Sequence, residues 1–134
     1  VRVADAVRIG DLKMPAGSVA VDEAGRVWAA DVAGHVACYA LGGRKLFDVA
    51  ASPAVAVPDA RLPLGSPLPA VVRCDGKGTA WVLLTLGRKV LVLNEKGEAR
   101  GEAKAVPETV GPLHRAAATP AGALVIGEKA LWRP

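Results

Sequence analysis

The two histidines, His35 and His114, have the clearest capacity for chemistry, because imidazole titrates near neutral pH and binds metal ions. Asp31 lies four residues before His35, a spacing at which the two side chains can chelate a metal or form a general-base pair across a turn. The same spacing also suits a hydrogen bond that only stabilises the turn. We favour turn or surface roles for both histidines, and we predict no bound metal or cofactor.

The candidate nucleophiles lack the surroundings that would activate them. Cys38 and Cys74 fall in or beside apolar runs, which predicts buried, inert thiols that do not form a disulfide. Ser18, Ser52 and Ser66 are not part of a nucleophile-elbow sequence. The sequence therefore favours a protein that is not an enzyme.

Composition indicates one folded domain of 134 residues, 51% hydrophobic and 22% charged. The net charge is +4 and the longest basic clusters are pairs, which argues against a nucleic-acid binder. No apolar run approaches the roughly 18–20 residues that a membrane-spanning helix needs. The chain begins at Val1 with no charged-then-apolar leader. The compartment is left open, with a periplasmic or secreted location preferred.

Short apolar runs separated by glycine and proline repeat along the chain. The Gly-Arg-Val-Trp of residues 25–28 recurs as Gly-Thr-Ala-Trp at 78–81 and as Gly-Ala-Leu-Val at 122–125, at offsets of 53 and 44 residues. A period near 40–45 with four short strands per unit is the signature of β-propeller blades. Because Trp28 and Trp81 occupy equivalent places, we expect both to pack between blades rather than to stack on a ligand.

The repeats predict an all-β protein of three blades. The blades span residues 14–50, 69–106 and 114–134, and a proline-rich loop at 51–69 joins the first two. The predicted strands are 18–22, 26–30, 36–41 and 45–49, then 69–73, 79–84, 89–94 and 98–106, then 115–119, 123–126 and 130–133. Residues 98–106 alternate charged and small side chains, which favours an outermost strand over a helix. The third blade lacks a fourth strand, and we expect residues 1–9 to complete a blade.

Three blades do not close a ring, because propellers run from four to eight blades. An open arc would leave two apolar faces in water. Two alternatives follow. A second copy could close a six-bladed ring as a homodimer, or the missing blades could belong to a longer chain.

Residues 15–36 resemble an NHL-type repeat, in which proline and glycine precede an apolar strand, an aspartate turn, an aromatic residue and an alanine-aspartate pair. In that turn Asp22 can accept hydrogen bonds from backbone amides, and Gly25 can take a positive φ. The resemblance implies a six-bladed propeller, and the gluconolactonase (senescence-marker-protein) family shares the pattern. Those lactonases hold a divalent metal with side chains that include the aspartate of a proline-aspartate-glycine triplet. Here Ala16 takes that place, and the only asparagine is Asn94. The resemblance therefore argues for the fold and against lactonase chemistry in this chain.

The loops that join second to third strands, and one blade to the next, open on the same face of a propeller, where partners bind. We therefore predict a binding or scaffolding module that engages a protein or a small ligand through this face. The alternative is part of a metal-dependent lactonase-type hydrolase whose site lies mostly outside the chain. The predicted partner-binding rim consists of Asp31, His35, Arg61, Arg88, Lys89, His114, Glu128 and Lys129.

Overall fold

The glycine-bounded apolar runs form three antiparallel sheets in the computed structural model, which describes residues 16–31, 34–49 and 69–134. The first sheet contains β1 (Ala16–Val21), β2 (Val27–Asp31), β3 (Val36–Tyr39) and β4 (Lys45–Val49). The second contains β5 (Ala70–Cys74), β6 (Ala80–Leu84), β7 (Lys89–Leu93) and β8 (Lys104–Ala105). A short 3₁₀ helix, η1 (Glu108–Val110), leads to the third, which contains β9 (Leu113–Thr119), β10 (Gly122–Gly127) and β11 (Leu131–Trp132).

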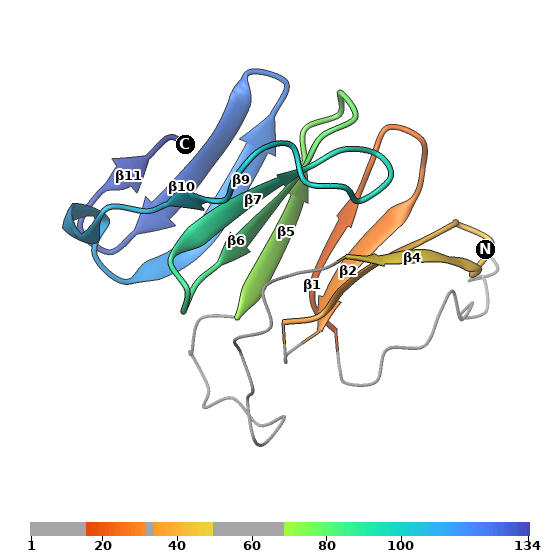
Figure 1. Ribbon diagram of the computed structural model, residues 1–134, viewed down its shortest axis with the longest axis horizontal. Coiled ribbons are helices and arrows are strands. Elements are labelled where there is room, and N and C mark those ends of the chain that lie inside the picture. Colours follow the sequence, from red (N-terminus) through yellow and green to blue (C-terminus); the bar gives the residue numbers. More distant parts are fainter. Residues whose placement is uncertain (1–15, 32–33, 50–68) are drawn as a thin grey trace, which may run out of the picture.

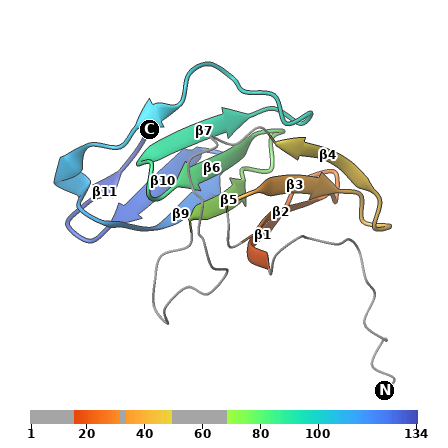
Figure 2. The same cartoon turned by 60° about the horizontal axis from the view of Figure 1, so that its bottom comes forward.

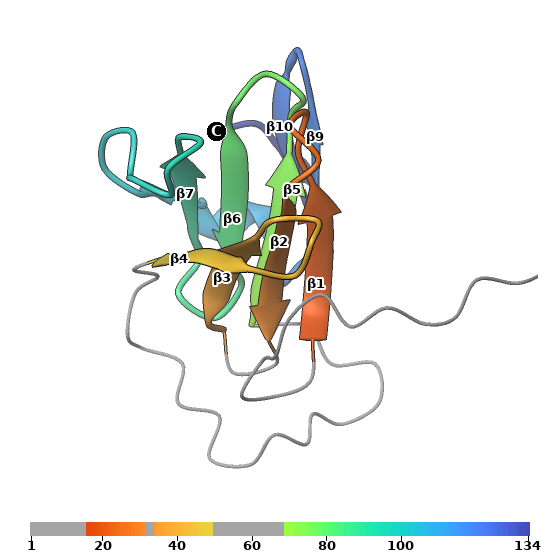
Figure 3. The ribbon, with the colours of Figure 1, turned by 90° about the vertical axis from the view of Figure 1, so that its right-hand side faces the viewer.

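The three sheets are packed face to face in chain order, from the orange first sheet to the blue third sheet in Figure 1. Each sheet pairs its strands sequentially, so β1, β5 and β9 are the first strands of their sheets. These first strands lie on one side of the stack (Figure 3), and β5 contacts both β1 and β9. The view in Figure 2 shows the same order from below. This arrangement confirms the predicted all-β fold of consecutive antiparallel sheets, which have four, four and three strands.

Two hydrophobic clusters hold the sheets together. Trp28 from the first sheet packs with Val72 and Val82 of the second, and all three are almost fully buried. On the opposite face of the second sheet, Leu83 packs with Val125 of the third. Trp81 lies at the edge of this second cluster. Both tryptophans therefore pack between sheets, as the repeat predicted.

The predicted strand at residues 98–106 is only partly correct. β8 pairs with β7 over two residues, and one isolated bridge joins Leu93 to Ala99. Between these contacts Gly101 adopts a φ of 82°, a conformation that glycine accommodates and that interrupts an extended strand. Period-two alternation identified the edge of the sheet but could not locate this interruption.

Two predicted segments lie outside the described residues. They are the strand at residues 1–9 and, except for Pro69, the loop at 51–69. The third sheet has three strands among the residues that the structure describes. Within the same residues, no helix has the length and apolar character needed to cross a membrane.

The outer faces of the first and third sheets carry exposed apolar side chains. Val19 and Val21 of β1 are 53% and 60% exposed, and Leu131 of β11 is 64% exposed. If a second copy covers both faces, light scattering should give twice the 13.7 kDa mass of the chain. A monomer at 13.7 kDa would contradict the homodimer and leave the blades of a longer chain as the cover.

Gly127 marks a close approach between the third sheet and the segment before it. A methyl group at this position would overlap the carbonyl oxygen and Cγ1 of Val110. We expect Gly127→Ala to lower the free energy of unfolding by about 1–3 kcal/mol, the usual cost of overpacking. Gly42→Ala is the matched control, because a methyl group there meets no atom within 4 Å. Urea denaturation measures the free energy of unfolding of the two variants, and an equal loss in both would contradict the close approach at Gly127.

Candidate functional site

The predicted rim residues that the structure describes lie along the lower edge of the sheets in Figure 1, where β6 turns into β7 and where β2 leads toward β3. The turns on the upper edge join the first strand of each sheet to the second. The two edges therefore present different sets of side chains. Apart from Lys89 and Arg61, the rim residues divide into one pair on the first sheet and one group around η1.

Asp31 and His35 form the pair on the first sheet. The His35 backbone N–H donates to Asp31 Oδ1 at 2.9 Å, and His35 Nδ1 lies 3.0 Å from Asp31 Oδ2. The Asp31 side chain is 3% exposed, whereas the His35 side chain is 75% exposed. Because carboxylate oxygens accept hydrogen bonds, His35 Nδ1 is the donor in this contact and Nε2 is left for a hydrogen bond with another molecule.

Arg88 connects the β6–β7 turn to the segment around η1. Its Nη1 donates to the carbonyl oxygen of Gly111 at 2.7 Å, and its Nη2 donates to that of Pro107 at 2.8 Å. Its Nε lies 3.6 Å from Glu108 Oε1. Arg88 itself has a φ of 52°, within the left-handed region. The guanidinium therefore holds the connection between the second and third sheets.

The same connection brings three further rim residues together. Glu128 and Lys129 donate backbone N–H groups to the carbonyl oxygens of Pro112 and Val110, at 2.9 and 3.1 Å. His114 Nε2 lies 3.9 Å from Glu128 Oε2, and both side chains are largely exposed. This second group is therefore Arg88, His114, Glu128 and Lys129, whereas Lys89 is exposed at the start of β7. Arg61 lies outside the described residues.

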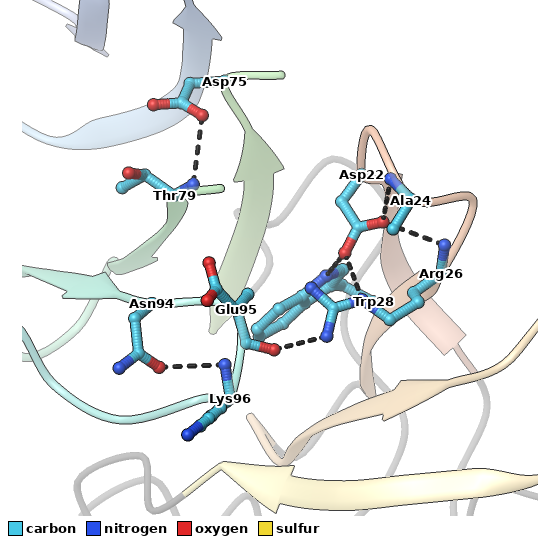
Figure 4. A network of polar contacts seen from close by, with 9 residues as sticks. All are labelled: Asp22, Ala24, Arg26, Trp28, Asp75, Thr79, Asn94, Glu95 and Lys96. Carbon is cyan, nitrogen blue, oxygen red and sulfur yellow. Dashed lines mark hydrogen bonds and ion pairs between the residues drawn. The ribbon is translucent and has the colours of Figure 1, made fainter. Parts of the chain in front are cut away.

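The opposite edge carries a polar network, of which the sequence predicts only the Asp22 turn (Figure 4). Asp22 was predicted to bond backbone amides in its turn, and its Oδ1 accepts from Ala24 N and Arg26 N at 3.0 and 2.9 Å. The Asp22 carboxylate also accepts from Arg26 Nε at 2.7 Å and from Trp28 Nε1 at 2.9 Å. Arg26 Nη1 donates to the carbonyl oxygen of Glu95 in the second sheet. The network therefore ties the first two sheets together.

The turn itself recurs in each sheet. Asp75 Oδ1 accepts from Lys77 N and Thr79 N at 2.7 and 3.1 Å, as Asp22 does in the first repeat. In the third sheet Thr119 Oγ1 accepts from Ala121 N at 3.2 Å. Each turn therefore keeps a side-chain oxygen that accepts from a backbone N–H, but the residue that supplies it changes from aspartate to threonine in the third sheet. This change explains why the third repeat is hard to detect from sequence.

The two cysteines are free thiols, as predicted. Burial raises the pKa of Cys38 to about 11 and that of Cys74 to about 12. At pH 8 only about one thiol in a thousand or fewer is then ionised. We expect a thiol reagent to label neither cysteine within minutes in the native protein and to label both in denaturant. Rapid labelling of the native protein would contradict these pKa values.

Among the described residues, no group of three or more His, Cys, Asp or Glu side chains is arranged to hold a metal ion. No protein-family model and no curated protein matches the sequence. The solved structures that resemble the fold include two lyases. One is a catalytically inactive virginiamycin B lyase from Staphylococcus aureus with quinupristin, at 9% identity and a TM-score of 0.59, covering 88% of this chain and 40% of that one. The other is a streptogramin B lyase, at 11% identity and a TM-score of 0.60, covering 91% of this chain and 42% of that one.

At such low identity the two likenesses concern the fold alone. The chain spans about two-fifths of the length of these structures. Its three antiparallel sheets are accordingly part of a β-propeller.

Proposed function

We propose that the chain is a β-propeller binding or scaffolding module that engages a protein or a small ligand through its rim. The observation that carries this proposal is the Asp31–His35 pair. His35 is the more exposed member, at 75%, and yet its ring is held at Nδ1 by a carboxylate that is 3% exposed. An exposed side chain held by a buried partner is suited to contact another molecule.

Binding normally costs about 0.5–1.5 kcal/mol for each flexible side chain that becomes ordered. The His35 ring incurs less of this cost because Asp31 already orients it. Its Nε2 is then directed toward a partner, with which it can form a hydrogen bond. Loop faces of propellers are where such contacts are usually made.

Capture from a cell extract of the source organism tests the proposal, with bound proteins and small molecules quantified by mass spectrometry. His35→Ala removes the contacting ring, and Asp31→Asn keeps the shape of the turn but weakens the hold on the ring. Lys96→Ala is the control, because Lys96 is exposed on the opposite edge. We expect each rim variant to capture at least tenfold less of a partner than the wild-type protein and the control do. Equal capture by all four proteins would overturn the proposal.

The alternative function is part of a lactonase-type metal enzyme. A metal present at a hundredfold above its dissociation constant stabilises the folded state by about 2.7 kcal/mol. Thermal melting with Ca²⁺ or Zn²⁺ therefore distinguishes the two functions. An unchanged melting temperature would contradict a metal site in this chain, whereas saturable stabilisation with lactone hydrolysis would establish the enzyme.

A further inference from the structure

Three arginines of the described residues are half-buried, namely Arg26, Arg73 and Arg88. Arg26 pairs with Asp22 at 2.7 Å, and Arg88 has Glu108 at 3.6 Å. Arg73 has no carboxylate within 4 Å in the part of the chain that the structure describes. A guanidinium stays charged at any physiological pH. Arg73 is therefore a partly desolvated positive charge that these residues do not neutralise.

The Arg73 guanidinium is held in place by all three sheets. Its Nε donates to the carbonyl oxygen of Ala116 in β9 at 3.0 Å. Its Nη1 donates to the carbonyl oxygen of Val72 at 2.8 Å and lies 3.3 Å from Ser18 Oγ in β1. Ser18 is buried and its Oγ also accepts from Val72 N at 3.1 Å. The side chain thus lies where the first strands β1, β5 and β9 meet, and not on the rim.

One nitrogen of the guanidinium remains available. Nε and Nη1 have acceptors, but Nη2 has none among the described residues. Among the described residues, the buried side-chain nitrogens without a hydrogen-bond partner are Trp81 Nε1 and Arg88 Nε. Nη2 of Arg73 is not one of them. Nη2 is therefore reached by solvent, and its two N–H groups can donate to a bound molecule.

We propose that Arg73 anchors a binding site for an oxyanion, a carboxylate or phosphate group, on the side of the stack formed by the first strands. The ligands of the site are the Nη2 hydrogens, and the attraction comes from the uncompensated charge. Charge-assisted hydrogen bonds of this kind are about twice as strong as neutral ones. Because three backbone or hydroxyl oxygens already fix the guanidinium, little rotamer freedom is lost when the anion binds. This site is separate from the His35 rim and does not depend on it.

The test titrates the ¹⁵N-labelled 134-residue chain with inorganic phosphate, and separately with acetate, while sodium chloride keeps the ionic strength constant. We expect the Arg73 side-chain N–H resonances to shift saturably with at least one of the two anions. Phosphate alone would identify a phosphoryl group as the ligand, and acetate alone a carboxylate. Shifts with both would identify a general oxyanion site.

Matched variants assign the binding to Arg73. Arg73→Gln should weaken binding by about tenfold or more, the loss expected for a charge-assisted hydrogen bond. Arg115→Gln removes the same charge from an exposed position on β9 and should change binding by less than about twofold. Equal binding by the two variants would overturn the proposal. So would the absence of a saturable shift at Arg73 in the unmodified chain, which decides the matter even if Arg73→Gln fails to fold.

Discussion

Asp22→Ala is expected to lower the free energy of unfolding by about 3 kcal/mol, since it removes a buried partner of a charged side chain. The carboxylate is 4% exposed and accepts four hydrogen bonds, two of them from the side chains of Arg26 and Trp28. Without it, the Trp28 Nε1–H is left buried without an acceptor, and Arg26 loses its carboxylate. Urea denaturation followed by circular dichroism measures the loss.

Asp75→Ala is the matched control for this prediction. Asp75 occupies the same place in the second repeat, but among the described residues its carboxylate accepts only from the backbone amides of Lys77 and Thr79. We expect a cost of about 1 kcal/mol, typical of backbone hydrogen bonds in a partly exposed turn. Equal losses for the two variants would show that the turn, and not the connection between sheets, carries the effect.

The same network makes stability depend on acid pH. Burial by itself raises the pKa of Asp22, but hydrogen bonds from Trp28 and Arg26, with the Arg26 charge, outweigh it and hold the pKa below 3.8. A carboxyl with a lowered pKa contributes stability above pH 3.8, and this contribution is lost as the pH falls through the lower folded value. The stability difference between wild type and Asp22→Asn should therefore narrow below about pH 4. A difference in unfolding free energy that stays constant down to pH 2 would contradict this role of the Asp22 carboxylate.

Trp28→Ala is expected to cost about 3–5 kcal/mol, the range for removing a fully buried aromatic side chain. The ring is 1% exposed and meets Phe47 edge to face, with the ring centroids 5.3 Å apart. The Arg26 guanidinium lies 5.9 Å from the centre of the ring. Denaturant unfolding measures the cost, and a loss below about 1 kcal/mol would contradict the role of Trp28 between the sheets.

The equivalent tryptophans differ in their polar partners, which phenylalanine substitutions should reveal. Trp28→Phe loses the hydrogen bond to a buried carboxylate and should cost about 1.5–3 kcal/mol. Trp81 Nε1 is buried with no acceptor among the residues described, so Trp81→Phe removes an unsatisfied donor. We expect that variant to be near neutral or stabilising. A similar loss of unfolding free energy in both variants would contradict this difference in hydrogen bonding between the two indole N–H groups.

Much of this fold was accessible from local sequence. Glycine and tryptophan at matching offsets located the strands, because turn chemistry and hydrophobic periodicity act over a few neighbouring residues. The same local signals identified the Asp22 turn and the Asp31–His35 contact, each of which joins residues four apart. The break at Gly101 was missed, since alternation persists through it.

Local sequence was enough to predict the strand order, the turn at Asp22 and the packing of Trp28 and Trp81 between sheets. The roles of Arg73 and Arg88 became visible only once the sheets were packed, because their acceptors are mainly backbone carbonyls of distant segments. Arg73 reaches Ala116, 43 residues away, and Arg88 reaches Gly111, 23 residues away. Every residue carries a carbonyl, so no side-chain pattern marks which one an arginine will meet. The packing of the sheets selects the carbonyl that each arginine meets. The proposed anion site at Arg73 depends on the same packing.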